Sequence, residues 1–248
     1  MPPDRMSLDG RSPDRVALDP VKPDPVLPPG QVPVARHRPF GLPRFGPVVP
    51  RTDGPAVVTV TGAVRHPVQV RAADLAGLPN RTTRVADLHC VTTWSVLDLS
   101  WAGVPFRDVH AYLTERTRPW SAVRWVTFRG LDGYASTLRL DDALAPDVLL
   151  ADTLDGAPLD PDVGAPLRLV APAHYGYKNV KHVCQIEYRT AYDAGSAGWK
   201  GHPRGRVARE ERSRHLPGRV WRPVWRAVLP RARAAYESGR AHTNGGRP

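Results

Sequence analysis

Residues 87–95 read DLHCVTTWS, and the rest of the chain is organised around this stretch. An apolar run of β-forming residues at 82–88 leads into it, so Cys90 is predicted to lie where a strand opens into a loop. A second stretch, HYGYKNVK at 174–181, gathers cations and a glycine about ninety residues later. Cations, glycine and free backbone N–H groups together suit a phosphate. We interpret the first stretch as binding a metal and the second as holding the cofactor that carries this metal.

Composition limits the class of protein. The 248 residues can bury a sizeable core in one large domain or two small ones. No run of about 18 apolar residues occurs, so no transmembrane segment is predicted. Residues 1–29 are rich in Pro and Asp and lack the apolar region of a secretory signal, so we expect a cytoplasmic protein. Two cysteines are too few for a disulfide framework, and we interpret Cys184 as core.

The positive charge is concentrated at one end of the chain. Residues 200–248 hold 13 basic and three acidic residues, and so carry +10 of the formal net charge of +11. Residues 1–199 hold 22 basic and 21 acidic residues and are balanced. A high isoelectric point often signals nucleic acid, but here the charge comes from one segment. No nucleic-acid partner is therefore expected for the body of the protein.

Three regions follow one another along the chain. Residues 1–30 are predicted to be a flexible lead-in, 31–205 the main domain, and 206–248 a basic C-terminal extension. In the main domain, seven or eight short apolar runs with short helices between them predict an α+β fold with mixed β-sheets. In the extension, apolar residues at helical spacing predict an amphipathic helix that Pro230 bends or ends. This helix either packs its Trp face on the body or docks on a membrane surface or acidic partner.

Cys90 has three interpretations from its neighbours alone. A lone cysteine beside aromatic residues is most often a buried small hydrophobe. It could instead be a nucleophile with His89 or His174 as its base. It could also be one soft ligand to a metal whose other ligands come from a cofactor. No C-x-x-C or H-x-x-x-H spacing supports a zinc or iron–sulfur site made by the protein alone, so these three interpretations stay open.

A second constellation of cationic residues follows in Arg168, His174, Lys178, Lys181 and His182. The two lysines fall on one side if the residues between them make a helical turn. The pattern matches no Walker or dinucleotide-binding fingerprint. It therefore indicates either a phosphate site of another kind or a solvated basic turn.

Several motifs occur in an order typical of one family. They are HCVTTWS at 89–95, WAGVPFRDV at 101–109, LDGY at 131–134, GAPLRLV at 164–170 and YGYKNVK at 175–181. In this order they resemble the sulfite-oxidase-like molybdopterin oxidoreductases over roughly residues 28–205, and the short single-domain bacterial members most closely. The resemblance implies the sulfite-oxidase-like molybdopterin-binding fold.

The resemblance also implies a cofactor and its ligands. Molybdenum in this family takes two sulfurs from the pterin dithiolene and one from a cysteine, and Cys90 occupies the cysteine position. The remaining resemblance concerns contacts to the pterin and its phosphate. The implied cofactor-binding residues are Arg44, Phe45, His89, Gly130, Arg168, Lys178, Asn179, Val180 and Lys181.

The implied activity is oxygen-atom transfer on a small-molecule substrate. Sulfite oxidases carry arginines shortly after the ligand cysteine, whereas residues 91–95 hold no cation, so sulfite is not the expected substrate. His202 and Trp199 fall where the family returns to the metal and are substrate-side candidates. The chain has no C-x-x-C-H haem site and no cysteine cluster, so a separate electron-transfer protein of haem or flavin type is expected.

Two other functions compete with this prediction. The Arg-rich tail could make the chain a nucleic-acid or acidic-surface binding module, in which case deleting residues 206–248 would abolish salt-sensitive binding. Alternatively, Cys90 could be the nucleophile of a metal-free enzyme, in which case an alkylating reagent would titrate a thiolate with a pKa well below about 8.5.

Overall fold

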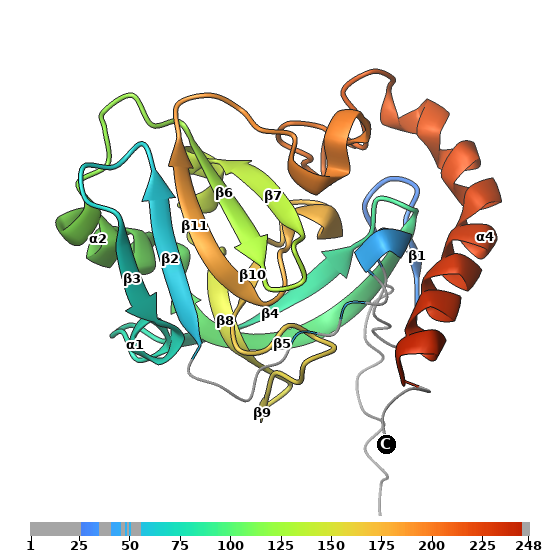
Figure 1. Ribbon diagram of the computed structural model, residues 1–248. Helices are drawn as coiled ribbons and strands as arrows, with labels where there is room; N and C mark the ends of the chain where they lie inside the picture. The colour runs from blue at the N-terminus through green and yellow to red at the C-terminus, as the bar shows by residue number, and fades with distance from the viewer. Residues whose placement is uncertain (1–25, 35–40, 46–47, 49, 51–55, 245–248) are drawn as a thin grey trace, which may run out of the picture.

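The fold is taken from a computed structural model that describes residues 26–34, 41–45, 48, 50 and 56–244. Most of the predicted lead-in lies outside the described residues, as do residues 35–40, 46–47, 49 and 51–55. Two β-sheets pack with short helices around them, and a long helix stands at one edge of the molecule (Figure 1). This arrangement confirms the predicted α+β fold with mixed sheets.

The first sheet has five strands in the order β3-β2-β11-β6-β7. Its β2 and β11 strands are parallel, and the other neighbours are antiparallel. The strands are β2 (Val57–Gly62), β3 (Val68–Arg71), β6 (Trp125–Gly130), β7 (Ala135–Arg139) and β11 (Val183–Arg189).

The second sheet has six strands along the path β1-β5-β8-β10, where β4 pairs with β5 and β9 pairs with β8. The strands are β1 (Val32–Pro33), β4 (Thr82–His89), β5 (Trp94–Pro105), β8 (Leu149–Leu154), β9 (Ala157–Pro158) and β10 (Arg168–Val170). The β4–β5 pair joins the two sides of the Cys90 loop, so this sheet carries the predicted metal ligand at its end.

The helices are short except for two. They are η1 (Pro43–Phe45), α1 (Ala72–Ala76), α2 (Phe106–Thr117), α3 (Leu140–Ala143), η2 (Gly176–Lys178), η3 (Gly195–Lys200) and α4 (Gly218–Asn244). Helix α2 begins directly after Pro105, and its buried Phe106, Val109 and Leu113 fall at the predicted spacing. Helix α4 continues past Pro230, so the prediction that this proline could end the helix is wrong. The one backbone hydrogen bond that a proline removes is a small part of a helix of 27 residues that packs along the body.

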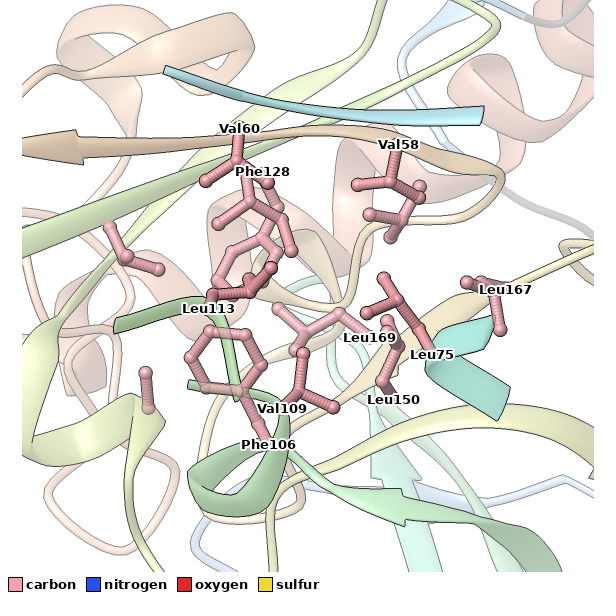
Figure 2. Packing of buried hydrophobic residues seen from close by; sticks show 14 of the residues in the cluster. Val58, Val60, Leu75, Phe106, Val109, Leu113, Phe128, Leu150, Leu167 and Leu169 are labelled. Carbon is pink, nitrogen blue, oxygen red and sulfur yellow. The ribbon is translucent and has the colours of Figure 1, made fainter. Parts of the chain in front are cut away.

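Two apolar clusters form the core, and the second sheet separates them. Figure 2 shows the larger cluster, in which α2 packs against β2, β6 and β8. Along β8 the side chains alternate, so that Leu150 joins the larger cluster while Leu149 and Ala151 join the smaller one. The smaller cluster contains Trp101, and Cys90 packs against it. The predicted site therefore rests on a packed apolar layer.

The segment after η3 returns to the body before α4 begins. Val207 is buried, and its N–H donates to the Ala173 carbonyl at 2.9 Å. The N–H of Tyr175 likewise donates to the Gly205 carbonyl at 2.9 Å. Residues 205–207 therefore pack on the body, and the domain boundary at residue 206 stays a prediction. Among the described residues, no helix is both long and apolar enough to cross a membrane.

Candidate cofactor site

The Cys90 loop is a tight turn between β4 and β5. The N–H of Cys90 donates to the Trp94 carbonyl at 2.8 Å, and the N–H of Thr93 donates to the Cys90 carbonyl at 3.2 Å. Thr93 adopts a φ of +77°, a left-handed conformation that is uncommon for a β-branched residue. Cys90 thus lies where the sequence predicted, at the point where a strand opens into a loop.

The Cys90 thiol packs against the smaller apolar cluster and has cations nearby. Its Sγ is 3.1 Å from the hydroxyl of Thr92. Burial raises the pKa of the thiol, while the Thr92 hydrogen bond and the charges of Arg212 and Arg233 oppose this rise. A raised pKa is the reverse of what a free nucleophile needs, whereas binding a metal displaces the thiol proton directly.

A chain of polar side chains fixes His89 beside this loop. The Ser95 hydroxyl donates to Gln31 Oε1 at 3.1 Å, and Gln31 Nε2 donates to the Cys90 carbonyl at 3.1 Å. The Ser95 hydroxyl has one proton and donates it to Gln31, so Ser95 Oγ can only accept from His89. His89 Nδ1 therefore donates to Ser95 Oγ, 2.8 Å away. Burial also lowers the pKa of His89. The neutral ring therefore keeps Nε2 as a hydrogen-bond acceptor.

Arg212 is a residue of this site that the sequence did not reveal. Its buried guanidinium donates to the Val91 carbonyl at 2.6 Å and to the Pro29 carbonyl at 3.1 Å. Its Nε donates to Glu210 at 3.2 Å, and the group lies 5.0 Å from the centre of the Tyr175 ring. Arg212 thus joins the loop after Cys90 to the residues before β1 and to the segment before α4. The acidic pair at 210–211 in an otherwise basic segment is the one signal that could have indicated it.

Three predicted residues, Gly130, Arg168 and Lys181, come together with Gly164 and form a second part of the candidate site, which we call the cradle. Gly164 has a φ of +130°, and a Cβ there would lie 3.2 Å from the Cβ of both Arg168 and Lys181. A Cβ on Gly130 would collide with the Lys181 carbonyl. The two glycines therefore let the backbones approach closely. In this way the structure brings Gly130, Arg168 and Lys181 together.

Arg168 provides the test of whether this cradle suits an anionic cofactor. Its Nη1 donates to the Val163 carbonyl at 2.7 Å, and its guanidinium lies 5.0 Å from the centre of the Trp101 ring. Its Nε is buried without a hydrogen-bond partner, and no carboxylate pairs with it in the described part of the chain. Burial lowers its pKa to about 10. Since a buried cation without a counter-ion is costly, the cradle fits a phosphate-bearing group.

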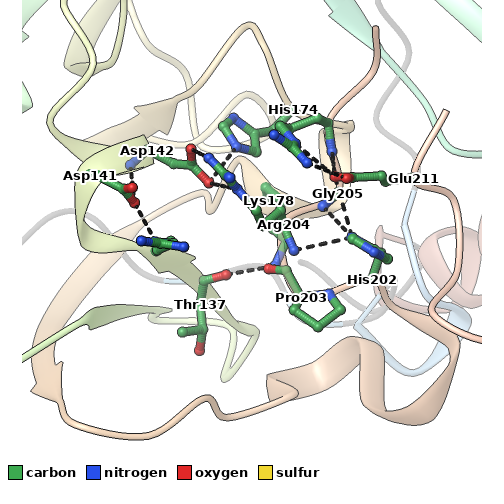
Figure 3. A network of polar contacts seen from close by, with 12 residues as sticks. Thr137, Asp141, Asp142, His174, Lys178, His202, Pro203, Arg204, Gly205 and Glu211 are labelled. Carbon is green, nitrogen blue, oxygen red and sulfur yellow. Dashed lines mark hydrogen bonds and ion pairs between the residues drawn. The ribbon is translucent and has the colours of Figure 1, made fainter. Parts of the chain in front are cut away.

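The side chains of Lys178 and Lys181 point to different parts of the protein. Its Nζ donates to the carbonyls of Thr137, at 2.6 Å, and Pro203, at 2.7 Å (Figure 3). Burial lowers its pKa to about 7. The helical turn η2 ends at Lys178, so the two lysines do not share a helical face. Lys181 Nζ donates to the Asp162 carbonyl at 3.2 Å, on the Arg168 side.

Asn179 and Val180 act on the backbone between the two lysines. Asn179 Oδ1 accepts from the N–H of Ala171 at 2.7 Å, and its Nδ2 donates to the Tyr175 carbonyl at 3.3 Å. Val180 is fully buried in the larger cluster, and its carbonyl accepts from the N–H of Leu169 at 2.8 Å. Both residues hold the stretch in place, and direct contact with a cofactor stays a prediction.

A polar network surrounds Lys178 (Figure 3). It fixes residues 201–217, the returning segment between η3 and α4, on the body. Asp142 accepts from Arg204 and lies 3.5 Å from His174 Nε2. Burial lowers the pKa of His174, so this imidazole is neutral. Glu211 accepts from Arg206 at 2.5 Å. The network binds strand β7, helix α3 and the returning segment into one unit.

The substrate-side candidates differ in position. His202 Nδ1 accepts the backbone N–H groups of Arg204, at 3.2 Å, and Gly205, at 3.1 Å, so its ring belongs to the network. Trp199 is 62% exposed, with its ring 6.0 Å from that of His215. The role of both residues on the substrate side stays a prediction.

Arg44 and Phe45, two of the predicted cofactor-binding residues, lie in η1. The Phe45 ring meets the Tyr134 ring edge-on, with centroids 5.3 Å apart. Arg44 Nη2 donates to the Ser196 carbonyl at 2.9 Å. The Tyr134 hydroxyl in turn donates to the Tyr177 carbonyl at 2.7 Å. Helix η1 therefore lies over the LDGY turn, next to the second sequence stretch.

The curated relatives that match the chain include two oxidoreductases. YuiH of Bacillus subtilis (strain 168), an uncharacterized oxidoreductase, is 36% identical over 129 residues, which cover 52% of this chain and 63% of that protein. The protein-methionine-sulfoxide reductase catalytic subunit MsrP of Xanthomonas campestris pv. campestris is 33% identical over 149 residues, which cover 54% of this chain and 45% of that protein. The chain thus spans about half the length of the curated relatives it matches.

A solved structure and a family model complete the comparison. The sulfane dehydrogenase SoxCD from Paracoccus pantotrophus matches with a TM-score of 0.50 and 20% identity, over 65% of this chain and 45% of that chain, which supports the fold alone. The model of the oxidoreductase molybdopterin binding domain matches residues 48–197, more than half of the chain. Molybdopterin with molybdenum is the cofactor of this family, as predicted. The chain belongs to the oxidoreductase molybdopterin-binding family, the sulfite-oxidase-like family that its motifs resemble.

Proposed function

We propose that this protein is a molybdenum-dependent oxidoreductase that moves an oxygen atom to or from a small substrate. The observation that carries the proposal is the buried guanidinium of Arg168, which has no carboxylate partner among the described residues and faces a cradle of close backbone approaches. When bound, the molybdenum cofactor supplies the two-electron redox chemistry of the transfer. The protein supplies binding, orientation and electrostatics.

Each residue of the site has a proposed role. Cys90 gives its thiolate to the metal, because a soft sulfur ligand suits a metal bound by pterin sulfurs. Arg168 and Lys181 neutralise the cofactor phosphate. His89 offers its Nε2 as an acceptor to the cofactor, since its Nδ1 is committed to Ser95.

The proposed substrate is a small sulfoxide. The names of two relatives, a methionine-sulfoxide reductase subunit and a sulfane dehydrogenase, both indicate sulfur chemistry. Residues 91–95 carry no cation, and the guanidinium of Arg212 is occupied by two carbonyls and Glu210. This supports a neutral sulfoxide over the sulfite anion. The electrons are proposed to come from a separate haem or flavin protein, because the sequence has no C-x-x-C-H motif.

The test measures metal and pterin in the same purified sample. Elemental analysis and the fluorescence of the oxidised pterin should give about one molybdenum and one pterin per chain. Cys90→Ala should lose the molybdenum, whereas the matched Cys184→Ala, a half-buried cysteine in β11, should keep it. Molybdenum retained in full by Cys90→Ala would sink the proposed ligand. Reduction of methionine sulfoxide by a reduced viologen dye, with sulfite oxidation as the comparison, then tests the substrate.

A further inference from the structure

Helix α4 has two faces with different surroundings. On the inner face, Trp221, Trp225 and Leu229 are half-buried, and Leu229 packs against the cluster that also contacts Cys90. On the outer face, Val220, Val224 and Val228 are each 43–44% exposed. Their i, i+4, i+8 spacing places them in one line along the helix. The two lines lie next to each other on the helix, about 100° apart, and form one wide apolar face, of which the body covers only the part with the two tryptophans and Leu229.

Arginines lie on the exposed side of the helix as well. Arg219, Arg226 and Arg231 are exposed, and none of them forms an ion pair with any described residue. The only acidic residue within α4 is Glu237. Leu216, which is 46% exposed, extends the apolar surface just before the helix begins. By helical spacing, Arg231 lies in line with the valines, and Arg219 and Arg226 lie on the other flank of the exposed side. The exposed side of α4, which we call its outer face, thus combines an apolar strip with unpaired positive charge.

The size and charge of this face select its partner. Three valines less than half exposed offer on the order of 200 Å², well below the roughly 800 Å² that each side of a stable protein interface buries. An anionic lipid surface needs no such area, because each arginine near it contributes about 1 kcal/mol. The apolar strip would then lie at the boundary between headgroups and acyl chains.

We propose that the outer face of α4 docks the protein on an anionic lipid surface. The helix stands at the edge of the molecule in Figure 1, where a flat surface can reach it along its length. Its inner face lies over the Cys90 loop, since the Arg233 guanidinium is 5.9 Å from the centre of the Trp94 ring. Docking would therefore hold the candidate cofactor site next to the lipid surface. The proposal does not depend on the bound cofactor.

The test is co-sedimentation of the full chain with vesicles. Phosphatidylcholine vesicles with about 30 mol % phosphatidylglycerol should bind the protein at low salt, and pure phosphatidylcholine vesicles should bind it at least tenfold more weakly. The triple variant Arg219→Gln/Arg226→Gln/Arg231→Gln should lose at least about tenfold in binding to the anionic vesicles. High salt should have a similar effect.

Matched controls separate this helix from general positive charge. Arg65→Gln/Arg84→Gln/Arg107→Gln removes three exposed arginines outside α4 and should keep full binding. Val224→Asp, at a position that is 44% exposed, should weaken binding to the anionic vesicles, and the unfolding temperature of this variant is measured beside it to show that the fold is kept.

Three results would overturn the proposal. One is equal binding to the neutral and anionic vesicles, and another is an equal loss in the two triple variants. The third is a dimer in sedimentation velocity without lipid that Val224→Asp dissolves, because the strip would then serve a second copy of the chain.

Discussion

Arg168 and Arg212 are both almost fully buried, at 4% and 1% exposure, yet the protein satisfies them in opposite ways. Arg212 reaches Glu210 and two backbone carbonyls, and it stacks near an aromatic ring. Arg168 has one carbonyl and no carboxylate among the described residues, and burial lowers its pKa to about 10.

The contrast separates a structural brace from a ligand-binding group. A buried cation with all its partners adds rigidity, because every donor is used within the fold. A buried cation without a counter-ion costs stability that a bound anion can return. The same residue type at the same burial should therefore respond in opposite ways to substitution in the cofactor-free protein.

The largest effect is expected from Arg212→Met. The substitution leaves the Val91 and Pro29 carbonyls without their donor, and it removes one of the two arginines that hold Glu210. Breaking a buried pair of this kind costs about 3–5 kcal/mol. Chemical unfolding of the cofactor-free protein measures the change. Arg209→Met, an exposed neighbour in the same segment, should stay within about 0.5 kcal/mol of the parent.

Arg168→Met should separate stability from cofactor binding. The unfolding free energy of the cofactor-free chain should change by less than about 1 kcal/mol, because the methionine replaces a buried cation that has no counter-ion among the described residues. The amount of pterin retained after dialysis should fall about 10- to 100-fold. This is the loss of affinity expected when one or two charge-assisted hydrogen bonds are removed. A loss of stability equal to that of Arg212→Met would show that Arg168 is also a brace.

Lys178 predicts a pH effect. Burial lowers its pKa in the fold to about 7, whereas the unfolded chain holds the ordinary value of 10.5. Between these values the unfolded state binds the proton and the native state does not, so stability rises with pH. Relative to Lys178→Met, the parent should gain at most about 1.4 kcal/mol per pH unit above pH 7. Unfolding of both proteins at pH 7 and pH 9 measures this. A difference that is flat with pH would mean that Asp142 and Glu211 keep the lysine charged.

The local patterns of the sequence were sufficient for much of the fold. The β-forming run before Cys90 predicted the strand and the loop after it, and Pro105 with three apolar residues predicted α2. These predictions succeeded because the signal lies within one element. The smaller apolar cluster and the parallel β2–β11 pair could not be predicted in this way, since they join distant parts of the chain.

The candidate site shows the same limit at the level of single residues. The resemblance grouped Gly130, Arg168 and Lys181, and the structure brings them into one cradle. The sequence also placed Lys178 with them, but it could not tell that this side chain turns toward two carbonyls in the interior. Arg212 lies 121 residues from its partner Val91, so no local pattern connects them.

The smallest effect is expected from Arg222→Gln, which tests the other partner of Glu210. Arg222 donates to both oxygens of Glu210 but is 32% exposed, whereas the Arg212 side chain is fully buried. Solvent screens the exposed pair, so its loss should cost less than about 1 kcal/mol and should shrink in high salt. In an Arg212→Lys background the same substitution should cost more, because Arg222 is then the remaining guanidinium on that carboxylate. Equal costs in the two backgrounds, measured by unfolding, would mean that Glu210 does not couple helix α4 to the Cys90 loop.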